Sequence, residues 1–215
     1  MNKISKIKRG PSAKELLELS HLSFKLTPIN LRELLFISVM PCDVFAIEDS
    51  LYKKILRQKS FINKSIIKEL FDRGYYRLFV RHEDREVLKE YQQDNLRKIT
   101  RSLSVGNPLE KGKKQMNLLT INMEYLYRDT TSDETLNLQF QSAKNLASFL
   151  LDNIELHEEL YKAFIKQKHH YIFAQPLLSS LFLLGVLKMS HLYSKRDIEN
   201  LFLTSYFKDI GMSLI

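Results

Sequence analysis

Few side chains of the types that bind metal ions or attack a substrate stand in a recognisable pattern, and most of them lie near the C-terminus. His169 and His170 are adjacent, and Asp209 directly follows Lys208. Imidazole and carboxylate groups suit transition-metal ions, which can activate water for hydrolysis. We expect the two histidines to be exposed or hydrogen-bonded at a helix start. For Asp209 we expect a local ion pair with Lys208 or a cap on the turn at Gly211.

The single cysteine, Cys42, excludes an intramolecular disulfide and a zinc site built from several cysteines, and it fits a reducing compartment. It follows Pro41 and has no histidine near it in the sequence, so we expect a small buried side chain rather than a nucleophile. The sequence contains no GxGxxG, GxxxxGKS/T, GxSxG or HExxH motif. A phosphate-binding loop, a hydrolase elbow and a metalloprotease helix are therefore not indicated.

Positive charge is concentrated in the first half of the chain. The net charge is +8, with +4 in residues 1–25, +9 in residues 52–114 and −2 in residues 115–215. A basic surface attracts anionic partners, and arginines interleaved with aromatic residues can bind a single nucleic-acid strand. The residues of this kind are Arg73, Arg77, Arg81, Arg85, Arg97 and Arg101 with Tyr75, Tyr76 and Phe79. Because acidic residues are interspersed and alternate strand residues point into the core, we expect a solvated surface instead.

The elements that must position these residues begin with a basic leader, residues 1–25, with a short helix over 13–24. Residues 26–82 form a small α/β module. Within it, segments rich in β-branched and aromatic residues predict strands at 31–39, 43–49, 51–58 and 75–80. Asn63 can cap a helix over residues 65–73, and Gly74 can end it in the left-handed conformation.

Helices dominate the rest of the sequence. Residues 83–115 form a connector, in which a long polar helix over 83–103 is followed by a basic hinge at 110–114. Residues 116–215 form an all-helical domain. Its predicted helices cover residues 118–127, 133–153, 155–166, 175–189 and 195–208. The expected fold class is therefore α+β, with a small N-terminal α/β domain, a long connector helix and an all-helical C-terminal domain.

One stretch of this helical domain, residues 171–187, contains no charged residue and approaches the length of a membrane span. Polar residues, Pro176 and Gly185 interrupt it, so we expect a helix buried inside the domain and no transmembrane segment. The basic leader is not followed by an apolar region, so we expect no secretory signal and a cytoplasmic location.

The sequence from residue 169 to residue 215 resembles the HD and HD-GYP superfamily of metal-dependent phosphohydrolases. In that family a helix with a His-Ser pair packs beside a second helix that ends in HDIGK, and here the second helix ends in KDIGM (208–212). The resemblance implies an HD-like helical domain. Upstream, the phrase GYYRLFVRHED (74–84) resembles the regulatory module that precedes HD-GYP domains in some bacterial signalling proteins.

The sequence departs from this family pattern at its ligand positions. Gln175 stands where the family has the first histidine, Lys208 replaces the histidine of His-Asp, and Met212 replaces the final lysine. Only Asp209 remains as a metal ligand. A protonated lysine repels a cation and is a poor ligand. The family's further histidines and its GYP segment would lie beyond the end of this sequence. We therefore predict no binuclear metal site, no cofactor and no hydrolysis.

Three functions remain open. The first is a non-catalytic regulatory or scaffold protein of bacterial cyclic-di-GMP signalling, which acts by protein contact or nucleotide sensing. Its partner would be another protein or a second copy, with pairing along residues 83–103. The second is an active metal phosphohydrolase acting on a cyclic dinucleotide, and the third is a basic nucleic-acid-binding protein. We expect the apolar residues of the last helix to pack on helices 133–166 or on another subunit. These residues are Leu201, Phe202, Tyr206 and Phe207.

Overall fold

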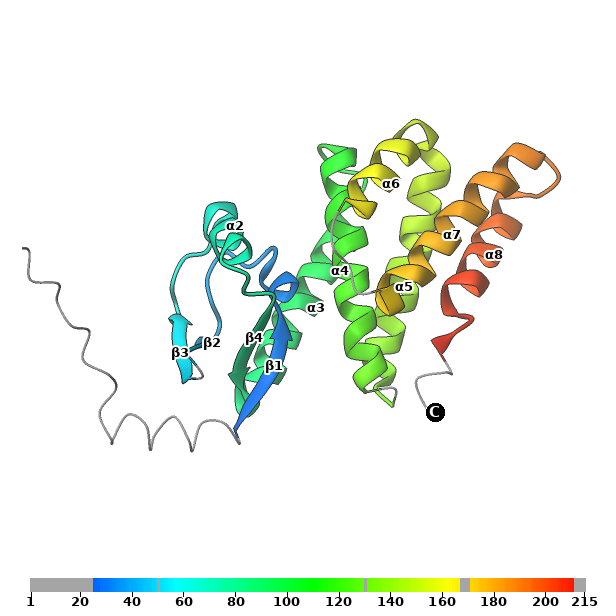
Figure 1. Cartoon of the computed structure of the whole chain (residues 1–215). Helices are drawn as coiled ribbons and strands as arrows, with labels where there is room; N and C mark the ends of the chain where they lie inside the picture. Colours follow the sequence, from blue (N-terminus) through cyan, green and yellow to red (C-terminus); the bar gives the residue numbers. More distant parts are fainter. Residues whose placement is uncertain (1–24, 50, 130, 167–170, 211–215) are drawn as a thin grey trace, which may run out of the picture. The chain divides into compact units, whose positions relative to one another are not determined.

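The computed structural model divides the chain into two compact units, unit 1 (Met1–Leu88) and unit 2 (Lys89–Ile215) (Figure 1). The described residues are 25–49, 51–129, 131–166 and 171–210. The helix expected over residues 13–24 lies outside these ranges, as do His169, His170, Gly211 and Met212.

Unit 1 contains a four-stranded antiparallel sheet. Its strands are β1 (Leu26–Asn30), β2 (Val44–Glu48), β3 (Leu51–Leu56) and β4 (Arg77–Arg81), in the order β1-β4-β2-β3. Phe45 of β2 pairs with Phe79 of β4, which places both rings on one face of the sheet. Leu78 and Val80 point to the other face and are fully buried. The strands expected at 43–49, 51–58 and 75–80 are confirmed.

The segment expected to be a strand over 31–39 is instead a 3-10 helix, η1 (Leu31–Leu34), and it follows a strand, β1, that the sequence did not predict. The side chain of Glu33 explains the turn. Its carboxylate accepts the Asn30 backbone N–H at 2.9 Å and also pairs with the guanidinium of Arg85. This side chain is completely buried, so the local backbone is fixed by a contact 52 residues away.

The helix α2 (Lys64–Asp72) confirms the prediction made from its two ends. The side chain of Asn63 accepts the backbone N–H of Ile66 at 3.0 Å, which satisfies one of the free donors of the first turn. At the other end, Gly74 has a φ of +81°, a conformation that glycine adopts without a Cβ clash.

The polar helix expected over 83–103 consists of a 3-10 turn, η2 (His82–Asp84), and then α3 (Arg85–Arg101). The basic hinge expected at 110–114 is wrong, because these residues form the first turns of α4 (Pro108–Arg128). Asn107 and Pro108, just before the expected hinge, are signals for the start of a helix. The Asn107 side chain accepts the backbone N–H of Glu110 at 3.2 Å, and proline is favoured at the first helical position.

Helix α4 is the centre of unit 2 (Figure 1). The helices around it are α5 (Asp133–Asp152), α6 (His157–Ile165), α7 (Tyr171–Ser190) and α8 (Lys195–Phe207), with a 3-10 turn, η3 (Ile154–Leu156), before α6. Every residue of α4 from Gln115 to Leu126 is buried, because α5, α6 and α7 all pack on this helix. A Cβ at Gly112 would lie 3.0 Å from a methyl carbon of Leu160, so glycine permits the close approach of α6.

The last two helices carry the positions that resemble a phosphohydrolase motif. α7 begins before the predicted start at residue 175 and continues through Pro176, which is buried. α8 begins with a capping box, in which Ser194 and Asp197 each bind the other's backbone N–H. Together the sheet and the helices confirm the α+β fold class.

The expected packing of the last helix is confirmed for Phe202, Tyr206 and Phe207, whereas Leu201 is 36% exposed. Phe202 and Tyr206 of α8 are fully buried, and the Tyr206 hydroxyl accepts the side-chain N–H of Gln139 on α5 at 2.6 Å. The Phe207 ring lies 6.0 Å from that of Phe140, also on α5. Residues of α8 therefore pack on the helix that covers residues 133–152.

Candidate functional site

The positions that resemble the His-Asp motif lie at the end of α8. Lys208 is the residue that ends the helix, and Asp209 follows it. The Lys208 ammonium is 3.8 Å from the Asp209 carboxylate, and both side chains are partly exposed. The local ion pair expected from the sequence is confirmed, so a cation lies beside the one carboxylate that the motif keeps.

Tyr127, near the end of α4, brings three helices together at this place. Its hydroxyl donates to the backbone carbonyl of Asp209 at 3.3 Å, and its ring meets the edge of Phe173 on α7 at a centroid distance of 5.6 Å. Burial and the negative charge of Asp209 both raise the pKa of the Tyr127 hydroxyl, which therefore remains a hydrogen-bond donor. The sequence motif did not reveal this residue, because Tyr127 comes from a helix 82 residues earlier.

Gln175 lies in the second turn of α7 and is half-buried. Its amide nitrogen donates to the hydroxyl of Ser179, one turn further along the same helix, at 3.0 Å. An amide used in this way supplies at most a weak, neutral carbonyl ligand. Gln175 therefore differs from the imidazole of the family pattern both in its chemistry and in its hydrogen bonding.

The described residues do not supply the donor set of a binuclear metal centre. Within ranges 25–49, 51–129, 131–166 and 171–210, no three His, Cys, Asp or Glu side chains cluster as metal ligands. His157 on α6 is half-buried, and its ring nitrogen bonds to the carbonyl of Leu150 at 2.9 Å. Burial lowers the pKa of His157, which favours the neutral ring. This contact holds the turn between α5 and α6.

Cys42 is 1% exposed, which confirms the expectation of a small buried side chain. Burial, together with the negative charges of Asp84 and Asp43, raises the pKa of its thiol to about 12. Thiolate is the reactive form, so near neutral pH this cysteine is protonated as well as shielded.

A thiol reagent is therefore expected to label Cys42 at pH 8 at least roughly 100-fold more slowly in the folded protein than in 8 M urea. The measurement is the rate of release of a chromophore from an aromatic disulfide reagent. Free cysteine in the same two buffers controls for the effect of urea on the reagent. Equal rates in folded and unfolded protein would contradict both the burial and the raised pKa.

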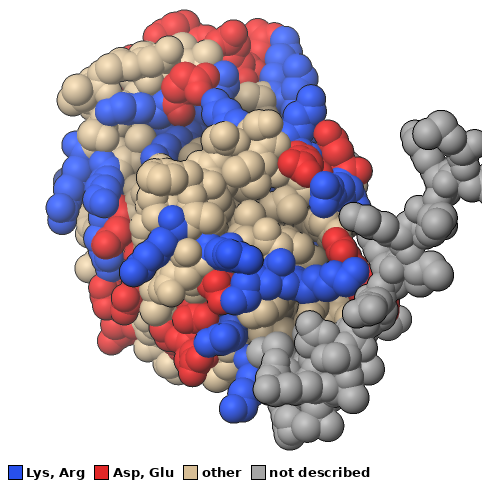
Figure 2. All heavy atoms as spheres, turned by 90° about the vertical axis from the view of Figure 1, so that its left-hand side faces the viewer, with Lys and Arg blue, Asp and Glu red and all other residues tan. Residues whose placement is uncertain are grey.

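Most of the arginines that could form a nucleic-acid surface have acidic partners. Arg73 pairs with Glu69 at 2.7 Å, and Arg97 pairs with both Asp94 and Glu134. Figure 2 shows the same mixture, with Lys and Arg side chains spread over one face and Asp and Glu between them. Of the three aromatic residues, Phe79 is buried, Tyr75 is half-buried and Tyr76 is 50% exposed.

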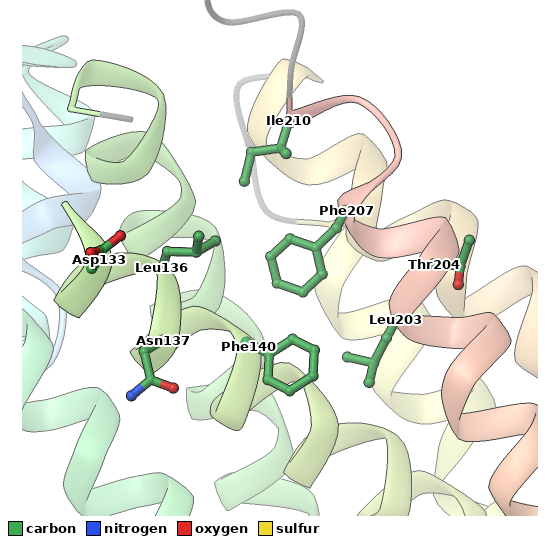
Figure 3. Close-up of a pocket in the computed structure, with 8 residues that line it drawn as sticks. All are labelled: Asp133, Leu136, Asn137, Phe140, Leu203, Thr204, Phe207 and Ile210. Carbon is green, nitrogen blue, oxygen red and sulfur yellow. The ribbon is translucent and has the colours of Figure 1, made fainter. Parts of the chain in front are cut away.

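A hollow of about 610 Å³ lies between α5 and α8 (Figure 3). Leu136 and Phe140 line it from α5, and Leu203 and Phe207 line it from α8, with Ile210 at one end. Polar side chains stand at its edge, namely Asp133, Asn137 and Thr204. The lining is thus mainly apolar. Phe207 was expected to be a packing residue, but no pattern in the sequence indicates that a hollow forms beside it.

Among the described residues, one helix, α7, is long and apolar enough to cross a membrane by its length and composition. The burial expected for it holds for one side only. Leu177, Leu181 and Leu184 are buried within unit 2, whereas Phe182 and Val186 are exposed.

Comparisons with known proteins support the fold. No protein-family model and no curated protein matches the sequence. Among solved structures, the chain is similar to Bd1817, described as a HDG"Y"P protein from Bdellovibrio bacteriovorus, with a TM-score of 0.60 and 13% sequence identity. The match covers 86% of this chain and 60% of that one, so this chain spans less than two thirds of that protein. At this level of sequence identity the similarity concerns the fold alone, and it shows that the chain has an HD-GYP-like fold.

Proposed function

We propose that this protein is a non-catalytic regulatory or scaffold protein of bacterial cyclic-di-GMP signalling. In this proposal the HD-GYP-like fold serves protein contact or nucleotide sensing rather than hydrolysis. The observation that carries the proposal is the Lys208 ammonium beside Asp209, at the place where the family pattern has His-Asp.

The chemistry of these side chains supports the proposal. Metal-assisted phosphodiester hydrolysis needs ions that activate water and neutralise the phosphate. The ammonium of Lys208 lies 3.8 Å from the Asp209 carboxylate and would repel a divalent cation at that position. Gln175 offers a neutral amide that is already bonded to Ser179. These groups can hold an anion or a protein partner more readily than two metal ions.

The test measures metal content and phosphodiesterase activity of the full chain. After incubation with Fe(II) or Mn(II) and removal of free ions, we expect well below one ion per chain and no hydrolysis of cyclic di-GMP. Binding of cyclic di-GMP without turnover would support the nucleotide-sensing form. Two ions per chain with hydrolysis would overturn the proposal and favour a phosphohydrolase.

The variant Asp209→Asn makes this test specific to the site. Asparagine keeps the size of the side chain and removes its charge. The Tyr127 hydrogen bond is retained because it goes to the backbone carbonyl. Under the proposal, metal content and activity are the same for Asp209→Asn and the parent chain. If the parent chain binds metal and the variant does not, Asp209 is a ligand and the proposal fails.

A further inference from the structure

The basic segment 98–114, which joins α3 to α4 in unit 2, is not part of the candidate site at Asp209. It carries five Lys or Arg residues and one acidic residue, Glu110. Glu110 pairs with Lys113 at 3.3 Å, so it already has a cationic partner. Three other basic residues of the segment form a group that we call the lysine cluster. They are Lys98 of α3 and Lys111 and Lys114 of α4.

Contacts between α3 and α4 bring the members of this cluster together. Hydrogen bonds made by side chains link the two helices in reversed sequence order, so the helices run antiparallel. These bonds join Lys111 to Ser102, Gln115 to Thr100 at 3.4 Å and Gln93 to Asn122 at 3.2 Å. In this register Lys114 lies beside the last turns of α3, which carry Lys98. Lys114 follows Lys111 by three residues, so both lie on the same side of α4.

The cluster holds like charges close together at a place that water only partly reaches. Lys114 is half-buried, and burial together with the positive charges of Lys98 and Lys111 lowers the pKa of its ammonium group. The Lys111 ammonium donates to the carbonyl of Ser102, which keeps it beside the end of α3. Like charges held in this way destabilise the folded unit, and a bound anion would relieve that cost.

Buried hydrogen bonds fix the helices that carry the cluster. Gln115 follows Lys114 and is completely buried. Its amide nitrogen donates to the carbonyl of Ser142 on α5 at 3.0 Å and to the side-chain oxygen of Asn145 at 3.3 Å. The hydroxyls of Thr100 and Ser142 are 2.9 Å apart, so α3, α4 and α5 are joined at one place. Charged groups that are held in position before a ligand arrives lose less entropy when it binds.

We propose that the lysine cluster binds a phosphate group. A lysine ammonium acts on phosphate as a point charge and has three N–H donors, so Lys111 can donate to a ligand as well as to Ser102. Three ammonium groups suit a multiply charged anion, whereas a carboxylate is matched best by the paired N–H groups of arginine. The phosphate can belong to the free anion, a nucleotide or a lipid headgroup. The inference goes beyond the proposed function and does not depend on whether the site at Asp209 binds metal.

The first test measures the binding of inorganic phosphate to the full chain by titration calorimetry at low salt. Lys114→Met keeps the length of the side chain and removes its charge. It is expected to raise the dissociation constant for phosphate at least roughly ten-fold. The matched control is Lys166→Met, because Lys166 is an exposed lysine at the end of α6. This control is expected to bind phosphate like the parent chain.

The second test uses the energetic cost of the cluster. Without phosphate, Lys114→Met is expected to raise the melting temperature by roughly 2–4 °C, because it removes a partly buried charge and its repulsion by two neighbours. With phosphate, the melting temperature of the parent chain is expected to rise, whereas that of Lys114→Met does not respond. A variant that is more stable and has nevertheless lost the response cannot owe this loss to misfolding.

Guanosine monophosphate and vesicles of phosphatidic acid in phosphatidylcholine identify the source of the phosphate. Binding of either probe that Lys114→Met weakens supports the proposal and names a nucleotide or a lipid as the source. Equal binding by the parent chain and Lys114→Met would overturn the proposal, as would a parent chain that binds none of the three probes. Binding that Lys208→Met abolishes and Lys114→Met does not would place the anion beside Asp209 and would also overturn it.

Discussion

Replacing Glu33 by alanine is expected to lower the free energy of unfolding of unit 1 by about 3–5 kcal/mol. Glu33 is completely buried, and its carboxylate pairs with Arg85, which is also buried. The same carboxylate accepts the Asn30 backbone N–H at 2.9 Å. Alanine removes both contacts and takes this carboxylate away from the buried Arg85 guanidinium. The cost of breaking a buried charge pair exceeds the value of an ordinary hydrogen bond.

The measurement is urea unfolding followed by circular dichroism, with Glu69→Ala as the matched control. Glu69 pairs with Arg73 on the exposed surface of α2, in the same unit. Its loss is expected to change the unfolding free energy by less than about 1 kcal/mol. Glu33→Gln retains an oxygen that can accept from Asn30 and is expected to fall between the two. Equal urea midpoints for Glu33→Ala and Glu69→Ala would contradict the role given to the buried pair.

Contacts between residues far apart in the chain explain why the strand β1 of unit 1 could not be predicted from the sequence. The helix α2 was predicted correctly because Asn63 and Gly74 give local signals at its two ends. By contrast, β1 has no strong pattern of its own and is stabilised by pairing with β4, with Leu26 opposite Arg81. Such a contact between residues far apart in the chain leaves no trace in a short window of sequence.

Local signals were also misinterpreted where one pattern has two meanings. The basic residues 110–114, which follow Asn107 and Pro108, were expected to form a hinge. An Asn-Pro pair can equally begin a helix, and here it begins α4. Gly112 in this helix also packs closely against Leu160 of α6, a contact with a residue much later in the chain that a short window of sequence does not reveal.

The candidate site was predicted in its residue types but not in its surroundings. The motif comparison indicated Gln175, Lys208 and Asp209, and the ion pair between the last two follows from their adjacency. The role of Tyr127 required the three-dimensional packing of α4 against α7 and α8. The buried hydrogen bonds that join Gln139 to Asn122 and to Tyr206 of α8 form a polar layer, which could not be predicted either. Buried glutamine and asparagine resemble surface residues in a sequence.

Gln139 is the centre of that polar layer and carries the second large prediction. Its amide nitrogen donates to the carbonyl of Leu119 at 3.0 Å and to the Tyr206 hydroxyl at 2.6 Å, and its oxygen accepts from Asn122 at 2.7 Å. All of these groups lie in the interior of unit 2. Gln139→Leu keeps much of the volume but removes three hydrogen bonds. We expect the unfolding free energy to fall by about 3 kcal/mol, because polar groups would remain buried without these partners.

Tyr206→Phe separates the contributions within this network. It removes only the hydroxyl that accepts from Gln139, which still donates to Leu119, so we expect a loss of about 1 kcal/mol. Gln139→Leu alone leaves the buried Tyr206 hydroxyl without its Gln139 partner. In the double variant Gln139→Leu with Tyr206→Phe, this hydroxyl is absent, so that cost disappears. The double variant should therefore be less destabilised than the sum of the two single variants, as urea unfolding can measure. Strict additivity would contradict a direct coupling of Gln139 and Tyr206. Because Tyr206 lies two residues before Lys208, this coupling also bears on how firmly α8 holds the candidate site.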